Sequence, residues 1–245
     1  MVAAENPKIF VLVPGCWHPP EVMDLLRFEI NKLGHESLAP KLPISDPDAT
    51  FDDHAKVVAD ACRDEERVIL VGHSRSGNVI PRAAGLVAVA GLVYMCATFE
   101  PATLVALKRP TDEEKDNMPP RIPKYRSSPI KDTANGLTVI DPKAARELFY
   151  NDCSDRNKDW AVSILQPQRR SSNEPSMLRW PDNTAQYSII CTDDRATNPD
   201  WLRYIYTRWL NLTPVELPGG HSPFLSRPQK LARVLVSFGV GNDGR

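Results

Sequence analysis

The chain lacks an excess of charge of either sign, and it lacks any regular spacing of cysteines. Its 245 residues include 30 basic and 31 acidic side chains, with a formal net charge of -1 and no long run of one sign. This balance gives no electrostatic reason to expect a nucleic acid or a membrane surface as a partner. Five cysteines, an odd number without tandem spacing, predict neither a disulfide framework nor a zinc site.

Targeting segments and long apolar runs are also missing from the pattern. Residues 1–6 have neither the charged region nor the apolar core of a signal peptide. The apolar run 85–98 is short and interrupted by Gly91, which is typical of a buried helix end followed by a core strand. We therefore expect a single cytoplasmic domain in a reducing compartment, and a chain of this length can bury a sizeable core.

The most informative motif is the segment 72–77, Gly-His-Ser-Arg-Ser-Gly. It follows the apolar run 68–71 and precedes a helix-like segment, residues 78–89. A Gly-x-Ser-x-Gly turn between a strand and a helix is a nucleophile elbow, which exposes the serine hydroxyl. Ser76 stands where the second glycine is expected, and serine is the next smallest residue. The motif predicts Ser74 as a nucleophile, although short Gly/Ser turns are common in any α/β fold.

A serine hydroxyl needs a base that removes its proton, and five histidines are candidates. His221 follows a strand-like run on a flexible Gly-Gly loop, where a base can be presented. His35 and His54 are expected at the surface. His73 adjoins the nucleophile, but neighbouring side chains in an elbow should point apart. We therefore predict His221 as the base, with an unrelated surface histidine as the alternative.

A carboxylate should orient the imidazole of the base. Asp193 and Asp194 directly follow the strand-like run 187–192, so the chain order would be Ser, Asp, His. Only one of the two can point at the histidine, and we predict Asp194 in that role. The other aspartate should cap the following turn or face solvent.

Backbone N–H donors for an oxyanion are expected on two loops. The first strand, residues 8–13, runs into the loop Pro-Gly-Cys-Trp-His-Pro-Pro. One donor should be the N–H of Arg75, directly after the nucleophile, and the other that of Cys16. Gly15 would let the backbone approach closely. A Pro-Gly pair can be a simple turn, but its position directly after the first strand favours the functional interpretation.

These motifs resemble those of the small α/β-hydrolases related to plant methyl esterases and hydroxynitrile lyases, and the resemblance covers nearly the whole chain. The matching segments are 13–18, 72–74, 191–195 and 219–221. The resemblance implies that the second aspartate of the pair is the acid and that Phe99 faces the pocket. Cyanohydrin-cleaving members differ, because they carry threonine in place of Gly15 and lysine in place of Ser222. Arg75 also departs from the relatives, which usually have an apolar or aromatic residue there.

The sequence divides into two regions with different residue patterns. Alternating strand and helix patterns predict an α/β-hydrolase core at residues 1–100 and 184–245, with a mostly parallel sheet of about six strands and helices on both faces. Residues 101–183 hold ten of the 23 prolines and should form a lid (cap) with a helix pair at 142–150 and 155–165. The alternative for this stretch is a disordered linker. Its most mobile part should be residues 108–131.

The sequence thus favours a cofactor-independent serine hydrolase that cleaves a carboxylic ester or related acyl bond of a small organic molecule. We expect no bound metal ion. Whether the chain forms a homodimer is left open by the sequence. The residues expected to shape the substrate pocket are Gly15, Trp17, His18, Phe99 and Tyr150. His18 would more readily have a hydrogen-bonded structural role than serve as a second acid or base.

Two other functions fit the same residues. A lyase, isomerase or cyclase of secondary metabolism would use His221 directly as the base, with Ser74 only as a hydrogen-bonding group. A ligand-sensing relative would keep the pocket, but it would have no need of an intact triad. Fold alone does not choose among these functions.

Overall fold

A parallel β-sheet forms the centre of the molecule. The computed structural model describes residues 6–62, 65–100, 111–122, 129–169, 180–181 and 183–238. Six strands follow the order β2-β1-β3-β4-β8-β9, and every neighbouring pair is parallel. The sheet confirms the fold class that the sequence predicts.

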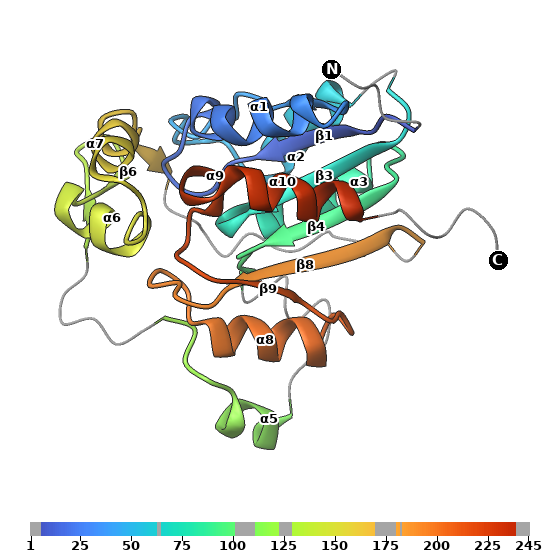
Figure 1. The fold of residues 1–245 in the computed structure, drawn as a ribbon. Helices are drawn as coiled ribbons and strands as arrows, with labels where there is room; N and C mark the ends of the chain where they lie inside the picture. Colours follow the sequence, from blue (N-terminus) through green and yellow to red (C-terminus); the bar gives the residue numbers. More distant parts are fainter. Residues whose placement is uncertain are drawn as a thin grey trace.

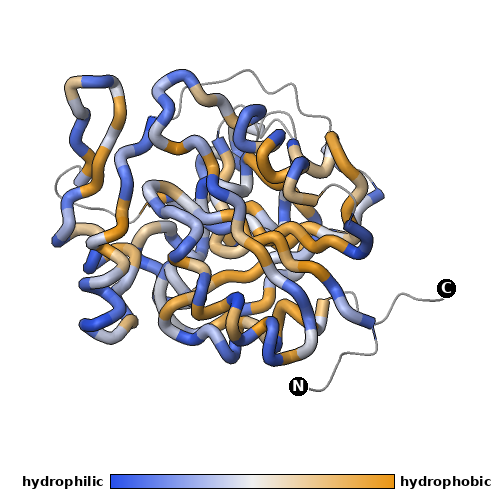
Figure 2. Tube along the Cα trace, turned by 90° about the horizontal axis from the view of Figure 1, so that it is seen from above, coloured by the Kyte–Doolittle hydropathy of each residue, from blue (hydrophilic) through white to orange (hydrophobic). Residues whose placement is uncertain are grey.

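The strands are short apolar runs, and Figure 2 shows them as hydrophobic segments inside more hydrophilic loops. The central strands β3 and β4 are buried along their whole length, because helices cover both faces of the sheet. The bounds are β1 Ile9–Val13, β2 Glu36–Leu38, β3 Val68–His73, β4 Gly91–Met95, β8 Ala185–Cys191 and β9 Val215–Leu217.

Helices pack on both faces of this sheet (Figure 1). On one face α1 (Asp24–Lys32) packs beside α10 (Pro228–Ser237), and on the other α2 (Phe51–Ala61) packs beside α3 (Ile80–Ala84). The helix α8 (Pro199–Arg208) packs against β8. Two short helices, η1 (Pro20–Met23) and α9 (Pro223–Ser226), complete the core. Within the described ranges no helix is long and apolar enough to cross a membrane.

The helix after the elbow is shorter than the sequence suggests. Instead of a helix over 78–89, the chain forms a 3₁₀ turn, η2 (Ser74–Asn78), and then the short helix α3. Pro81 lies at the start of α3 and has no N–H to donate back to the preceding turn, which separates the two elements.

His54 is buried rather than exposed, which corrects the expectation from sequence. It lies in the first turn of α2, and its ring meets that of Phe51 at a centroid distance of 6.5 Å. The polar residues around it mark only the outer side of the helix, so the composition of this turn misled the prediction. His35 is half-buried, and its Nδ1 accepts a hydrogen bond from the N–H of Lys8.

In the segment 101–183, here called the insertion, the described elements lie outside the central sheet (Figure 1). The predicted helix pair is present as α6 (Pro142–Leu148) and α7 (Asp155–Ser163), which pack together. A three-stranded antiparallel sheet, which was not predicted, is formed by β5 (Ile130–Asp132), β6 (Leu137–Ile140) and β7 (Gln168–Arg169). A further helix, α5 (Asp112–Asn117), starts with a capping box. Part of the segment expected to be mobile, 108–110 and 123–128, lies outside the described residues.

The elbow holds its serine in a strained backbone conformation. Ser74 has φ of 52°, in the left-handed region that non-glycine residues seldom adopt. A Cβ on Gly72 would lie 2.8 Å from the carbonyl oxygen of Ser76, and one on Gly77 would lie 2.7 Å from that of Thr98. Both glycines are therefore required by backbone packing.

Ser76, which replaces the second glycine of the motif, links the elbow to the loop after β1. Its side chain is buried, and its hydroxyl donates a hydrogen bond to the carbonyl oxygen of Pro14 at 2.5 Å. The serine therefore contributes a tertiary contact that a glycine would lack.

We predict that Ser76→Ala lowers the free energy of unfolding by about 1–2 kcal/mol, because a buried carbonyl loses its donor. For a chain of this size the melting temperature should fall by about 2–4 °C for each kcal/mol. The control is Ser237→Ala, because that exposed hydroxyl also donates to a backbone carbonyl. Equal melting temperatures for the two variants in calorimetry would contradict the structural importance of the Ser76 bond.

Candidate active site

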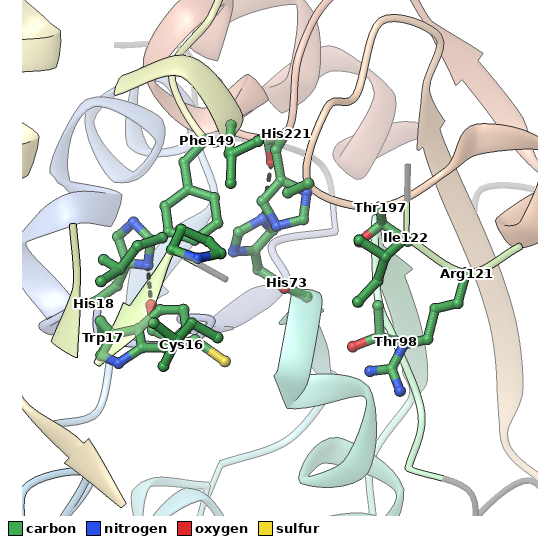
Figure 3. A pocket seen from close by; sticks show the side chains of 16 residues that line it. Cys16, Trp17, His18, His73, Thr98, Arg121, Ile122, Phe149, Thr197 and His221 are labelled. Carbon is green, nitrogen blue, oxygen red and sulfur yellow. Dashed lines mark hydrogen bonds between the residues drawn. The ribbon is translucent and has the colours of Figure 1, made fainter. Parts of the chain in front are cut away.

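A cavity of about 560 Å³ brings the predicted nucleophile and base together. Ser74, which follows β3, and His221, which follows β9, both line it, as Figure 3 shows for His221. The insertion forms much of the opposite wall. The other lining residues from the core are Cys16, Trp17, His18, His73, Thr98, Ala196 and Thr197, and those from the insertion are Arg121, Ile122, Pro129, Ile130, Ile140, Leu148 and Phe149.

The imidazole of His221 is held by Asp194. Its Nδ1 lies 2.7 Å from Oδ2 of Asp194, and both side chains are buried. The second carboxylate oxygen, Oδ1, accepts the N–H groups of Ala196 and Thr197 at 2.8 and 2.9 Å. A carboxylate only accepts hydrogen bonds, so Nδ1 of His221 carries the hydrogen of this bond. Nε2 is then the nitrogen able to accept a proton.

Asp193 has a different task from its neighbour. Its Oδ2 accepts the N–H of Gly219 at 2.8 Å, and its own N–H donates to the carbonyl oxygen of Gly219 at 2.9 Å. The two adjacent aspartates therefore hold two parts of the same loop. Asp194 orients the ring of His221, whereas Asp193 fixes the backbone that leads to it.

The glycines before His221 serve close packing rather than the flexibility expected from sequence. Both Gly219 and Gly220 are buried. A Cβ on Gly219 would clash with the side chains of Arg227 and Asp152, and one on Gly220 would clash with that of Asn151. The segment after α6 thus covers the loop of the base directly.

His73 supports the base, although we expected its side chain to point away from the site. Its ring lies 4.7 Å from that of His221, and its Nε2 donates to the carbonyl oxygen of His221 at 2.9 Å (Figure 3). Burial, followed by the nearby His221 and His18, lowers the pKa of His73 well below its ordinary value, so the ring is neutral. No local pattern predicts this contact, because it joins residues 148 positions apart.

The loop after β1 lies directly against the nucleophile. A Cβ on Gly15 would lie 2.9 Å from Cβ of Ser74 and 2.8 Å from Nδ1 of His73. Cys16 lines the cavity next to it, and burial raises the pKa of its thiol. Trp17 then adopts φ of 60°, a conformation that is costly for a bulky residue unless its surroundings hold it.

The insertion supplies the bonds that hold Trp17. The side chain of Gln168 accepts its N–H at 2.5 Å, and the N–H of Gln166 donates to its carbonyl oxygen at 2.9 Å. The indole N–H donates to the carbonyl oxygen of Thr138 at 3.1 Å. The strained loop is therefore fixed from β6 and β7.

His18 extends this support to Cys16. Its Nδ1 donates to the carbonyl oxygen of Cys16 at 2.5 Å, and its Nε2 accepts the hydroxyl of Tyr150 at 2.6 Å. This assignment follows because a carbonyl only accepts and a neutral imidazole has one donor. Burial lowers the pKa of His18 to about 4, so the ring is neutral near pH 7. The geometry favours the structural role of His18 over a second acid or base.

The predicted pocket residues have different positions. Trp17 and His18 line the cavity, whereas Gly15 and the buried Tyr150 lie behind its wall. Phe99, which the family resemblance places at the pocket, is not among the residues that line this cavity, and its ring packs against Tyr94 and Trp180. The side chain of Phe99 is fully buried, and the backbone three residues before it, at Cys96, has φ of 47°. Phe149 is an aromatic lining residue that the sequence analysis did not single out.

One group of metal-type ligands occurs among the described residues, but its atoms are already engaged. Single ligand atoms of Cys96, Asp194 and His221 lie within 4.8 Å of one another. Both carboxylate oxygens of Asp194 accept hydrogen bonds. Hydrogen bonding with Cys191, together with burial, raises the pKa of Cys96 well above its ordinary value, so the thiol is protonated. The group fits a hydrogen-bonded dyad with a neighbouring thiol rather than a metal site.

Comparison with known proteins identifies relatives that match along almost the whole chain. The alpha/beta hydrolase nvfD of Aspergillus novofumigatus is 28% identical over 92% of this chain and 94% of its own length. A carbendazim hydrolyzing esterase of Nocardioides sp. is 27% identical over 94% of this chain and 99% of its own. The crystal structure of a methylesterase from Arabidopsis matches with a TM-score of 0.74, at 17% identity over 94% of this chain and 98% of its own.

A model of the alpha/beta hydrolase family matches residues 10–234. This range includes all six strands of the central sheet apart from the first residue of β1. The order of the parallel strands and the esterases among the relatives agree with this match. The chain therefore belongs to the α/β-hydrolase family and resembles its plant methylesterases.

Proposed function

We propose that the protein is a serine hydrolase that cleaves a carboxylic ester or a related acyl bond of a small organic molecule. The observation that carries this proposal is that Ser74 and the hydrogen-bonded pair His221–Asp194 meet at one cavity. The esterases among the relatives support the same reaction class.

In the proposed reaction His221 moves the proton between the nucleophile and the leaving group. Nε2 takes the proton of Ser74 Oγ as that oxygen attacks the carbonyl carbon, and it then gives the proton to the departing alcohol. Asp194 stabilises the imidazolium that forms meanwhile. A water molecule, activated by the same nitrogen, attacks the acyl-serine and releases the acid. The cycle restores every group and uses no cofactor.

Two backbone N–H groups are proposed as donors to the oxyanion. Arg75 lies in the first turn of η2, where N–H groups point out of the turn without an intrahelical acceptor. Cys16 lies on the opposite side, on the loop that packs against Ser74. The bonds to Trp17 and His18 would keep the second donor in place before the substrate arrives, which is the preorganisation that lowers the barrier.

We propose the insertion as a lid whose inner side forms part of the substrate pocket. Its contribution to the cavity is mainly apolar, from Ile130, Ile140, Leu148 and Phe149. Ile122 is 60% exposed at the same cavity, so an apolar side chain stands at its rim. Such a lining favours the organic part of a small ester over a peptide or a sugar.

We predict that Ser74→Ala and His221→Ala each reduce the hydrolysis of p-nitrophenyl acetate by about a thousandfold or more, because members of a triad act as a unit. A fluorophosphonate should label the wild-type protein at Ser74, as seen by intact mass, and should leave Ser74→Ala unlabelled. Circular dichroism checks that both variants are folded.

Two results would reject this function. Hydrolysis at the wild-type rate in Ser74→Ala would remove the serine as nucleophile. Absence of labelling, in a protein that still converts a substrate through His221, would favour the lyase or cyclase chemistry that the same residues allow.

Asp194→Asn should reduce kcat by about a thousandfold or more, because an amide at this position no longer fixes the required tautomer of His221. Asp193→Asn should cost less than about tenfold, since its amide oxygen can still accept the N–H of Gly219. Steady-state kinetics on the same ester compare the two. A larger loss in Asp193→Asn would show that the wrong aspartate has been assigned to the base.

Tyr150→Phe should lower kcat by about tenfold with little change in KM, because His18 loses the bond that steadies Cys16 while the donor itself remains. The matched control is Tyr204→Phe, whose hydroxyl makes a long 3.5 Å contact with a carbonyl oxygen outside the cavity. A fall in KM or in melting temperature without a fall in kcat would mean that Tyr150 serves only packing.

A further inference from the structure

The proposed reaction uses the backbone N–H of Arg75 but not its side chain. Only its backbone N–H would face the oxyanion, yet its guanidinium is carried into the interior, with 8% of the residue exposed. The guanidinium lies over the ring of Phe51, 4.3 Å from the centroid. Arg75 therefore places a positive charge in the interior, on the residue directly after the proposed nucleophile.

A second cavity, of about 290 Å³, begins where Arg75 lies. We call it the side cavity. It shares five wall residues with the cavity at Ser74, so the two adjoin: Cys16, Trp17, Thr98, Arg121 and Ile130. Its remaining walls are Arg75, Glu100, Thr138, Gln168 and Arg169.

The charges around the side cavity are unequal. Its described wall carries three guanidinium groups and one carboxylate, that of Glu100. This excess of positive charge also acts on Cys16, which lines both cavities. Burial and the charge of Glu100 raise the pKa of its thiol, whereas the charges of Arg75 and Arg121 lower it, and together they outweigh Glu100. A cavity of this kind favours a negative group and disfavours a positive one.

The arginines are held in place by the surrounding chain. The N–H of Asn198, at the start of α8, donates to the carbonyl oxygen of Arg121 at 3.0 Å. The guanidinium of Arg121 lies 5.6 Å from the ring of Trp201, and Figure 3 shows its side chain directed to the Thr98 side of the pocket. Nη1 of Arg169 donates to the carbonyl oxygen of Ala49 at 2.8 Å. Such anchored guanidiniums lose little freedom when they bind an oxyanion.

We propose that the side cavity binds a carboxylate of the substrate, so that the preferred substrates are esters carrying a free carboxylate a few bonds from the cleaved acyl group. This inference rests on the proposed ester hydrolysis at Ser74. Arg75 and Arg121 are the groups that would hold the carboxylate, because the planar fork of a guanidinium matches its two oxygens. The side cavity would thereby give the charge of Arg75 a role in substrate binding.

The test compares p-nitrophenyl monoesters of succinic, glutaric and adipic acid with the same compounds whose free carboxylate is capped as a methyl ester. In the wild-type protein kcat/KM should be higher for the acid than for its capped partner, by about tenfold to a hundredfold at the best chain length. The preference should lie mainly in KM, since the carboxylate is bound before and during the reaction. High salt should reduce it.

Variants test which residues cause the preference. For each variant we compare kcat/KM for the free acid with kcat/KM for its capped partner. Arg121→Gln and Arg75→Gln should each bring the ratio close to one, and Arg121→Lys should keep part of it. The matched control is Arg146→Gln, because Arg146 lies on α6 and pairs with Asp155 and Asp159, away from both cavities. It should keep the wild-type ratio. Thermal melting verifies that each variant is folded.

A binding measurement separates this inference from the proposed reaction. Calorimetry on Ser74→Ala measures the affinity for the corresponding monoanilides, with and without the methyl cap, and needs no turnover. Tighter binding of the free acids, lost in Arg121→Gln, would support the side cavity even if the esters were not cleaved. Equal binding of acid and capped compounds would overturn it, whereas hydrolysis of p-nitrophenyl acetate that requires Ser74 would leave the proposed reaction intact.

Discussion

The contact of the loop after β1 with both the elbow and the insertion is the constraint on which the site depends. The loop can lie against Ser74 only because Gly15 has no side chain. It can keep the left-handed conformation of Trp17 only because Gln166, Gln168 and Thr138 bind the backbone and the indole. One short segment therefore joins the central sheet to the insertion.

His221, the proposed base, is supported in a comparable way, through partners of several kinds. Asp194 holds the ring, Asp193 holds the preceding backbone and His73 donates to the following carbonyl. The bonds of Asp194 and His73 are buried, where an unsatisfied group would be costly, and that of Asp193 is partly buried. The neutral state of His73 fits this arrangement, because a second positive charge beside His221 would oppose its protonation.

Local patterns predicted the features that depend on neighbours in sequence. The strands appear as apolar runs, and the elbow appears as small residues around Ser74, because both arise within a few residues. Contacts between distant segments left no such pattern. The pairing of β6 with β7 and the burial of His54 and Phe99 all follow from tertiary packing. The support of Trp17 from the insertion belongs to the same class.

The packing of Asn151 and Asp152 over Gly219 and Gly220 has a thermodynamic consequence. The amide of Asn151 also donates to the carbonyl oxygen of Asp193 at 3.1 Å, so the insertion holds the loop of the base as well as that of the proposed oxyanion donor. If the insertion unfolded alone, both loops would lose these contacts while the parallel sheet could stay intact. For the proposed chemistry, the fraction of competent molecules would therefore depend on the local stability of the insertion as well as on the global stability of the fold.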